Sequence, residues 1–167
     1  MQQGFVPDTG PTSDEAMTFS SSIEIARASE LVYDLIADIT RMGEWSPVCT
    51  GGRWVDGGGP ELGNWFIGFN THNGRSWETR SKVETAKRGQ AFAFVVGGDG
   101  VRWAYEFSAV PDGTTVTESW SLLPAGVAVF EAKYGEMAAD IIADRRQAAR
   151  WSIPLTLAAL KSAAEAL

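Results

Sequence analysis

The last part of the chain, from residue 136 to residue 167, has the longest helical repeat of apolar positions. Apolar or small residues recur there at a spacing that places them on one stripe of a helix. These residues are Ala138, Ile142, Ala149, Ile153, Leu157, Leu160, Ala164 and Leu167. The pattern predicts one long C-terminal helix with an apolar face that needs a partner. Because Pro154 cannot donate a hydrogen bond to the carbonyl of Arg150, we also predict a kink or break between Arg150 and Ile153.

Most of the chain before this helix alternates between apolar and polar residues, which is typical of strands with one buried face. Turn residues separate the alternating segments, and Asn73-Gly74 is the strongest hairpin signal among them. The alternation predicts strands over residues 18–27, around Trp54, and over 63–72, 75–85, 90–96, 101–110 and 114–123. Gly51-Gly52 and Gly57-Gly58-Gly59-Pro60 flank the second of these strands and are predicted to form turns.

Two short helices are predicted between the first and second strands. Ser29 is a candidate N-cap for the first, whose apolar face includes Leu35 and Ile36, and Thr40 for the second, which ends before Pro47. The order of elements therefore predicts an α+β fold, in which a curved antiparallel sheet of about seven strands surrounds the long C-terminal helix. Residues 1–16 are predicted to be a flexible leader, and residues 17–167 a single domain.

Composition and charge exclude several classes of function. The chain has 167 residues and a formal net charge of −7, which disfavours binding to nucleic acid and to anionic membrane surfaces. No apolar run is long enough to cross a bilayer. The first residues lack the basic start and apolar core of a secretory signal. We therefore expect a cytoplasmic protein without an integral membrane segment.

Residues that bind metals or act as nucleophiles are scarce. The single cysteine, Cys49, is expected to be a small buried hydrophobe, and the single histidine, His72, is expected to be exposed beside the Asn73-Gly74 turn. We therefore predict no metal site and no cofactor. Seven tryptophans are the unusual part of the composition. Large rings can fill a core or line a cavity for a flat apolar ligand, and composition alone leaves both alternatives open.

Alternation along each strand indicates which side chains face the interior, because residues two apart share a face. In the last strand the apolar positions put Glu118 on the same inward face as Val116, Trp120 and Leu122. By the same reasoning, the inward residues of two other strands are Trp77, Thr79, Ser81, Val83, Trp103, Tyr105 and Phe107. In the strand over residues 90–96 both alternating sets are apolar, and bulk alone favours Phe92, Phe94 and Val96 over Ala91, Ala93 and Val95.

Several short motifs accompany this order of elements. They are Leu31-Val32-Tyr33-Asp34-Leu35-Ile36-Ala37-Asp38-Ile39, Glu44-Trp45-Ser46-Pro47, Phe66-x-Gly68-x-Asn70, Trp77-Glu78-Thr79, Trp103-x-Tyr105 and Gly113-Thr114-x-Val116-Thr117-Glu118-Ser119-Trp120. Together they resemble the START-like (SRPBCC) superfamily of polyketide cyclases/dehydrases and lipid-transport proteins, and its actinobacterial branch in particular, over residues 19–167. The resemblance implies a helix-grip fold with a deep cavity between the sheet and the C-terminal helix. Members of the superfamily range from aromatase/cyclases to lipid binders, so the fold does not fix the activity.

The strand over residues 63–72 has two apolar faces, and the resemblance favours one of them. The two alternative inward sets are Trp65, Ile67 and Phe69, favoured by apolarity, and Phe66, Gly68 and Asn70, favoured by the resemblance. If the second set faces inward, the first set forms an apolar patch on the outside. Such a patch is a candidate homodimer surface, or a surface that the leader covers.

Glu118 is the ionisable residue with the clearest chemical interest, since it is predicted to lie among apolar inward residues. Burial would raise its pKa and suit it to proton transfer, unless a cation pairs with it. Arg145 interrupts the apolar stripe of the long helix, so we predict a buried ion pair of Glu118 with Arg145, or with Arg146 if the register differs by one residue. In the alternative, Glu118 and Tyr105 are the catalytic acid/base groups of an enzyme. The resemblance counts against an enzyme, because family aromatase/cyclases carry an inward arginine where this chain has Val83.

We therefore predict that the protein binds a hydrophobic small molecule, such as a lipid or a sterol-like or polyketide-like compound, in an internal cavity. Polar inward side chains would contact a carbonyl or hydroxyl of the ligand, and Trp45 is expected near the mouth of the cavity. The candidate ligand-binding residues are Trp45, Phe66, Asn70, Trp77, Thr79, Ser81, Phe92, Phe94, Trp103, Tyr105, Glu118, Trp120 and Arg145. A polyketide cyclase or aromatase-dehydratase is the alternative function, and a protein-interaction or toxin-like module is the third.

Overall fold

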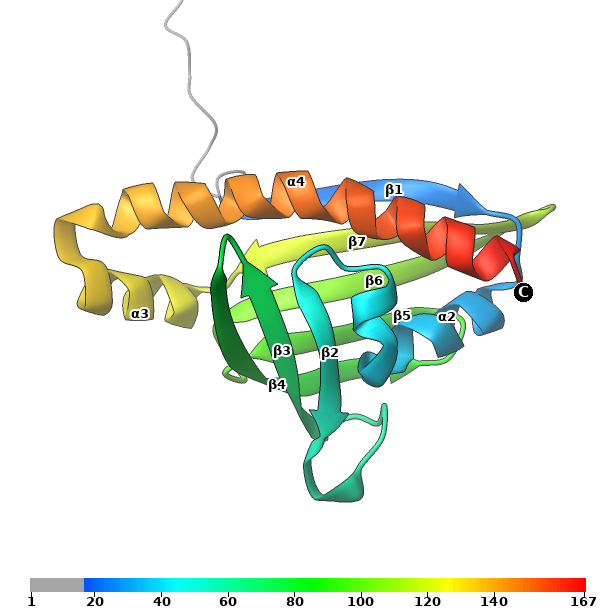
Figure 1. The fold of residues 1–167 in the computed structure, drawn as a ribbon, viewed down its shortest axis with the longest axis horizontal. Helices are drawn as coiled ribbons and strands as arrows, with labels where there is room; N and C mark the ends of the chain where they lie inside the picture. Colours follow the sequence, from blue (N-terminus) through cyan, green and yellow to red (C-terminus); the bar gives the residue numbers. More distant parts are fainter. Residues whose placement is uncertain (1–16) are drawn as a thin grey trace, which may run out of the picture.

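A seven-stranded antiparallel sheet forms the body of the protein, and the long C-terminal helix crosses its concave side (Figure 1). The structure, a computed structural model, describes residues 17–167. The strands lie in the order β1-β7-β6-β5-β4-β3-β2, so that the first strand pairs with the last. They are β1 (Thr18–Ile25), β2 (Cys49–Trp54), β3 (Trp65–His72), β4 (Arg75–Lys87), β5 (Ala91–Val96), β6 (Val101–Val110) and β7 (Gly113–Leu122). The predicted α+β helix-grip architecture is confirmed, whereas the predicted leader over residues 1–16 lies outside the described residues.

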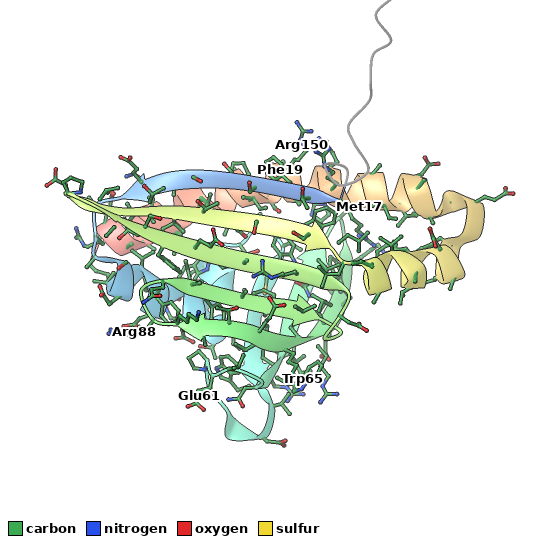
Figure 2. All side chains as sticks on the ribbon, turned by 180° about the vertical axis from the view of Figure 1, so that it is seen from behind. Met17, Phe19, Glu61, Trp65, Arg88 and Arg150 are labelled. Carbon is green, nitrogen blue, oxygen red and sulfur yellow. The ribbon has the colours of Figure 1, made fainter. Side chains whose placement is uncertain are left out.

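The long helix α4 (Ala138–Glu165) buries the apolar stripe that the sequence predicts. Ile153, Leu157 and Leu160 on this stripe are each at most 1% exposed. Burying a side chain of this size contributes about 1.5 to 3 kcal/mol, so the stripe anchors the helix to the sheet. At the edge of the sheet, the Arg150 guanidinium of α4 lies over the ring of Phe19 in β1, with 5.7 Å between Cζ and the ring centroid (Figure 2).

The long helix has no break between Arg150 and Ile153, because α4 continues through Pro154 without interruption. The predicted break is therefore wrong. Pro154 and Arg150 are both exposed. Solvent can therefore reach the backbone where the proline removes a helical hydrogen bond. The buried Ile153 and Leu157, on either side of Pro154 in the sequence, hold both halves of the helix against the sheet.

A helix that the sequence analysis did not predict, α3 (Pro124–Tyr134), connects the sheet to α4. Pro124 occupies its first turn and Gly135, at φ 55°, ends it. A proline at the start and a glycine just past the end are ordinary helix signals, and they were available in the sequence. The pattern of α3 is weak because Gly126 is its only buried residue. A short 3₁₀ turn, η3 (Gly135–Met137), leads from α3 into α4.

Gly51-Gly52 lies inside β2 and does not form the predicted turn. A side chain on Gly52 would have its Cβ only 2.7 Å from the carbonyl oxygen of Ile67 in the neighbouring strand. Glycine is therefore required here because two backbones approach closely, and not because the chain turns. The short 3₁₀ turn η2 (Val55–Gly57) follows β2.

The two predicted short helices after β1 are present as α2 (Ser29–Ala37) and the 3₁₀ helix η1 (Ile39–Glu44). Neither predicted cap is correct. Ala28 is the N-cap residue of α2, and no side chain caps this end. Asp38 caps η1, where its carboxylate accepts hydrogen bonds from the backbone N–H and the hydroxyl of Thr40. Asp38 thus satisfies a free donor at the helix start, and Thr40 is the residue that it contacts.

The outer face of the sheet is mainly polar, and Figure 2, which views the molecule from behind, looks onto this face. The apolar set Trp65, Ile67 and Phe69 faces this side, where all three side chains are half-buried. The Arg80 guanidinium covers the Trp65 ring, with 4.6 Å between Cζ and the ring centroid. The strand therefore has the orientation that the resemblance favoured, and a homodimer through this patch stays a prediction. Among residues 17–167, no helix is long and apolar enough to cross a membrane.

Candidate ligand-binding site

A cavity of about 230 Å³ lies between α4 and the concave face of the sheet. Small and polar residues of α4 form one wall of this cavity, with Ala149 on the apolar stripe and the others beside it. These residues are Arg145, Ala148, Ala149, Ser152 and Thr156. The apolar stripe also carries Ile153 and Leu157, which fill the core. The cavity exists because small side chains on this part of the helix face the sheet and do not reach the opposite wall.

Aromatic rings form the opposite wall, as the strand pattern predicts. They come from five strands and from the segment after η1, and they are Trp45, Phe66, Trp77, Phe94, Trp103 and Trp120. Phe66 and Phe94 make an edge-to-face contact with ring centroids 5.0 Å apart, which fixes both rings. Trp77 is 41% exposed and therefore marks an open side of the cavity, whereas Trp45, expected at the mouth, is only 4% exposed.

Polar groups of β3 and β4 also line the cavity. Asn70 lies opposite Trp77 in the register of these strands, and its Nδ2 is 3.4 Å from the hydroxyl of Thr79. Gly68 lies directly opposite Thr79, and a Cβ there would come within 2.9 Å of the Thr79 hydroxyl. The absence of a side chain at Gly68 therefore leaves room for Thr79 and for the cavity beside it.

Tyr105 and Glu118 form the most buried polar pair of the cavity wall. They are directly opposite each other in β6 and β7, so both side chains leave the sheet on the same face. The Tyr105 hydroxyl donates to Oε1 of Glu118 over 2.9 Å, and the two residues are 4% and 2% exposed. Burial raises the pKa of Glu118 to about 8, and the hydrogen bond from Tyr105 opposes this change. Burial also raises the pKa of Tyr105 well above its usual value, and the nearby Glu118 adds to this effect.

The predicted ion pair between Glu118 and Arg145 is wrong. Oε2 of Glu118 is buried and makes no hydrogen bond with any residue of the described chain. Arg145 lines the cavity but is exposed, because its long side chain reaches solvent at the rim. The neighbouring Arg146 points elsewhere and donates to the carbonyl of Thr18. Since no cation compensates a charge on Glu118, the neutral carboxyl is its favoured form at neutral pH.

Two candidate residues lie on the inward face but do not line the cavity. Ser81 is completely buried, and its hydroxyl has no hydrogen-bond partner in the described structure. Phe92 packs edge-on against Tyr33 of α2, with ring centroids 6.0 Å apart. The short helix α2 covers this end of the sheet, so Phe92 belongs to the core beneath α2.

His72 and Trp151 also line the cavity, although neither is among the predicted site residues. Their rings lie 5.3 Å apart across the gap between β3 and α4. His72 is half-buried, so its predicted exposure is wrong. The alternation that places Asn70 inward also places His72 inward two residues later, and this signal outweighs the nearby turn.

Cys49 of β2, predicted from the sequence to be a buried hydrophobe, also lines the cavity. It is only half-buried, and its thiol donates to the carbonyl of Gly51 over 3.3 Å. Burial raises the pKa of this thiol, which keeps it in the unreactive protonated form. The remaining lining residues that were not selected are Met42, Ser46, Val48, Gly68, Val96, Ala148, Ala149, Ser152 and Thr156.

The sheet, the covering helix and the cavity between them define a protein of the helix-grip fold. The chain belongs to the family described as polyketide cyclase/dehydrase and lipid transport, whose family model matches residues 16–156. The resemblance inferred from the sequence motifs is thereby confirmed. No curated protein matches the chain.

Solved structures with the same fold include a relative of clear sequence similarity. The polyketide cyclase-like protein Cgl2372 from Corynebacterium glutamicum is 42% identical, with 89% of this chain and 91% of that chain covered and a TM-score of 0.67. The di-domain ARO/CYC protein StfQ from the steffimycin biosynthetic pathway is 15% identical, with 92% of this chain and 52% of that chain covered and a TM-score of 0.67. The major latex-like protein 151 from Panax ginseng is 10% identical, with coverages of 80% and 95% and a TM-score of 0.54. The last two likenesses concern the fold alone.

Proposed function

We propose that this protein binds a hydrophobic small molecule, of a lipid, sterol-like or polyketide-like kind, in the cavity between α4 and the sheet. The observation that supports the proposal is the cavity itself. Protein interiors are normally filled to the density of organic crystals, and unfilled apolar space costs stability. Here the small residues Ala149 and Ser152 of α4 face the rings of the sheet and leave space that larger side chains would occupy.

The composition of the wall supports a flat or elongated apolar ligand with a few polar groups. Rings dominate the sheet side, and burial of apolar area against them contributes about 25 cal/mol per Å². Asn70, Thr79 and the Tyr105–Glu118 pair are the polar groups available to orient such a ligand. The family description, which includes lipid transport, agrees with this proposal.

The test is to fill the cavity without disturbing the fold. Ser152→Leu places a larger side chain in the cavity, and Ala158→Leu is the matched control because Ala158 is exposed on the same helix. Quenching of tryptophan fluorescence by a panel of sterols, fatty acids and aromatic polyketides should saturate for the unchanged protein and for the Ala158 variant. The Ser152 variant should bind at least about tenfold more weakly. Equal binding by both variants, or no saturable binding to any compound, would refute the proposal.

A second candidate function, polyketide cyclisation and dehydration, is favoured by one feature of the buried pair. Glu118 carries a proton at neutral pH because its pKa is raised to about 8, and a general acid near neutrality suits the loss of a hydroxyl as water. Val83 counts against this candidate, since it is buried where family aromatase/cyclases carry an arginine. Glu118→Gln and Tyr105→Phe should abolish the cyclised product from a poly-β-ketone made in situ by a minimal polyketide synthase. An unchanged product pattern with these variants would exclude catalysis by the pair.

A further inference from the structure

One hydrogen-bonding atom of the Tyr105–Glu118 pair in the cavity wall has no partner. The hydroxyl of Tyr105 donates its only proton to Oε1 of Glu118. Oε2 of the same carboxyl is buried and has no partner in the described chain. A buried polar atom of this kind is uncommon in native proteins and usually has a specific reason. Because Glu118 lines the cavity, a bound molecule is the partner that the geometry allows.

The protonation of Glu118 determines what that partner must offer. Besides the pair, the ionisable residues that line the cavity within the described chain are Cys49, His72 and Arg145. None of them forms an ion pair with Glu118, and Arg145 is exposed at the rim. The carboxyl is therefore neutral at neutral pH, a state that its raised pKa supports. With Oε1 accepting from Tyr105, the carboxyl proton resides on Oε2 and acts as a donor.

From this arrangement we infer that the cavity selects neutral ligands that present a hydrogen-bond acceptor, such as a ketone, quinone or ester carbonyl, to the Glu118 carboxyl. The inference rests on the proposed function and specifies its ligand class. A site with a buried unpaired donor favours a ligand that supplies the acceptor over an isostere that does not. An anionic ligand loses this advantage, because the apolar rings replace the water around its charge.

Three compounds of nearly the same shape separate the possible outcomes. They are 2-acetylnaphthalene, which carries a carbonyl acceptor, 2-isopropenylnaphthalene, which carries a methylene in its place, and 2-naphthoate, which carries a negative charge. Their dissociation constants are to be measured by equilibrium dialysis at pH 6.5. The ketone should bind at least about fivefold more tightly than the alkene, as expected for satisfying one buried donor. The carboxylate should bind more weakly than the ketone.

Two variants connect the preference to Glu118. Glu118→Leu removes the donor and should make the ketone and the alkene bind equally. Glu118→Gln keeps a donor without an ionisable group, so its preference for the ketone should persist. For the unchanged protein, the ketone affinity should fall about tenfold for each pH unit above about 8, because only the protonated fraction binds. The affinity of the Gln variant should stay constant over the same range, and this comparison stands even if the Leu variant does not fold.

Each alternative result has a distinct meaning. Equal affinities for the ketone and the alkene in the unchanged protein would overturn the inference and leave the proposed binding function intact. Tight binding of 2-naphthoate that is lost in Arg145→Met would also overturn it, because recognition would then occur through a charge at the rim. Absence of binding by all three compounds, together with no effect of Ser152→Leu on any lipid, would overturn the proposed function and the inference with it.

Discussion

Replacing Glu118 by glutamine is expected to change the way in which the stability of the protein depends on pH. The pKa of Glu118 is about 8 in the folded protein, against an ordinary value of 4.5. Between these two pH values the folded state keeps a proton that the unfolded state releases. The free energy of unfolding therefore falls as the pH rises. The contribution of the raised Glu118 pKa to the free energy of unfolding is fully present below pH 4.5 and is lost as the pH rises through about 8.

The size of this effect follows from the interval between the two pKa values. Each pH unit corresponds to about 1.36 kcal/mol, so the interval from 4.5 to about 8 corresponds to about 5 kcal/mol. Glutamine has nearly the same shape as glutamate and still offers an oxygen to the Tyr105 hydroxyl, but it has no charge to bury. The variant and the unchanged protein should therefore have similar stability at pH 5. At pH 9 the variant should be more stable by several kcal/mol.

Urea unfolding followed by tryptophan fluorescence at pH 5, 7 and 9 measures the difference directly. Other ionisable groups titrate in both proteins and cancel in the comparison. Glu106→Gln is a suitable control, since Glu106 lies next to Tyr105 in β6 but is exposed on the outer face, and its effect should stay within about 0.5 kcal/mol. A difference for Glu118→Gln that does not vary with pH would refute the neutral buried carboxyl. A variant destabilised by about 3 to 5 kcal/mol at pH 9 would indicate a cationic partner for Glu118.

Three further substitutions test the description of the fold. Pro154→Ala restores a helical hydrogen bond in α4 and should raise the free energy of unfolding by up to about 3 kcal/mol, and a decrease would show that the proline is required at this position. Gly126→Ala should lower the free energy of unfolding by about 1 to 3 kcal/mol, because the new Cβ would lie 2.5 Å from the carbonyl oxygen of Gly100. A neutral effect in urea unfolding would mean that α3 can move away. Phe92→Ala should lower the free energy of unfolding by about 3 to 5 kcal/mol, since the ring is completely buried against Tyr33. The Phe92 variant should still bind cavity ligands, and selective loss of binding by folded protein would place this ring in the site.

The sheet could be predicted from the sequence because two local signals agreed. Alternating apolar residues set the inward face of each strand, and turn residues marked the strand ends. The clearest case is the hairpin of β3 and β4, where Asn73 and Gly74 have φ values of 50° and 73° and His72 pairs with Arg75. The helix α3 could not be predicted in the same way, since its contacts bury little and leave almost no periodic pattern.

The facing of side chains could be predicted, but their position along the cavity could not. Ser81 and Phe92 have the correct orientation, yet other parts of the chain cover them. His72 was missed for the opposite reason, because it lies beside a turn that α4 happens to cross, where Trp151 contacts it. Alternation is a property of one strand, whereas these positions depend on where distant helices cross the sheet.

The ion pair was predicted wrongly because it rested on two exceptions to a pattern. Glu118 and Arg145 each interrupt an apolar stripe, and pairing them assumed that both charges are buried. A buried carboxyl can avoid the cost of its charge by keeping a proton, and an arginine on a helix can extend to solvent. The structure combines these two solutions, since burial raises the pKa of Glu118 beside Tyr105 and Arg145 is exposed at the rim.

Two adjacent stripes of α4 have different roles: the apolar stripe packs against the sheet, and the stripe of small and polar residues beside it lines the cavity. Residues that stabilise the fold are therefore largely distinct from residues that shape the site. Ile153, Leu157 and Leu160 hold the helix against the sheet, whereas Ser152 and Thr156 on the neighbouring stripe determine how much space remains beneath it. A substitution on the second stripe changes the volume and polarity of the cavity without removing the contacts that position the helix. The same fold persists in proteins that are only 10 to 15% identical to this chain. We therefore expect ligand preference within this fold to follow the residues of the second stripe and the polar pair opposite, and to be independent of the residues that hold the helix in place.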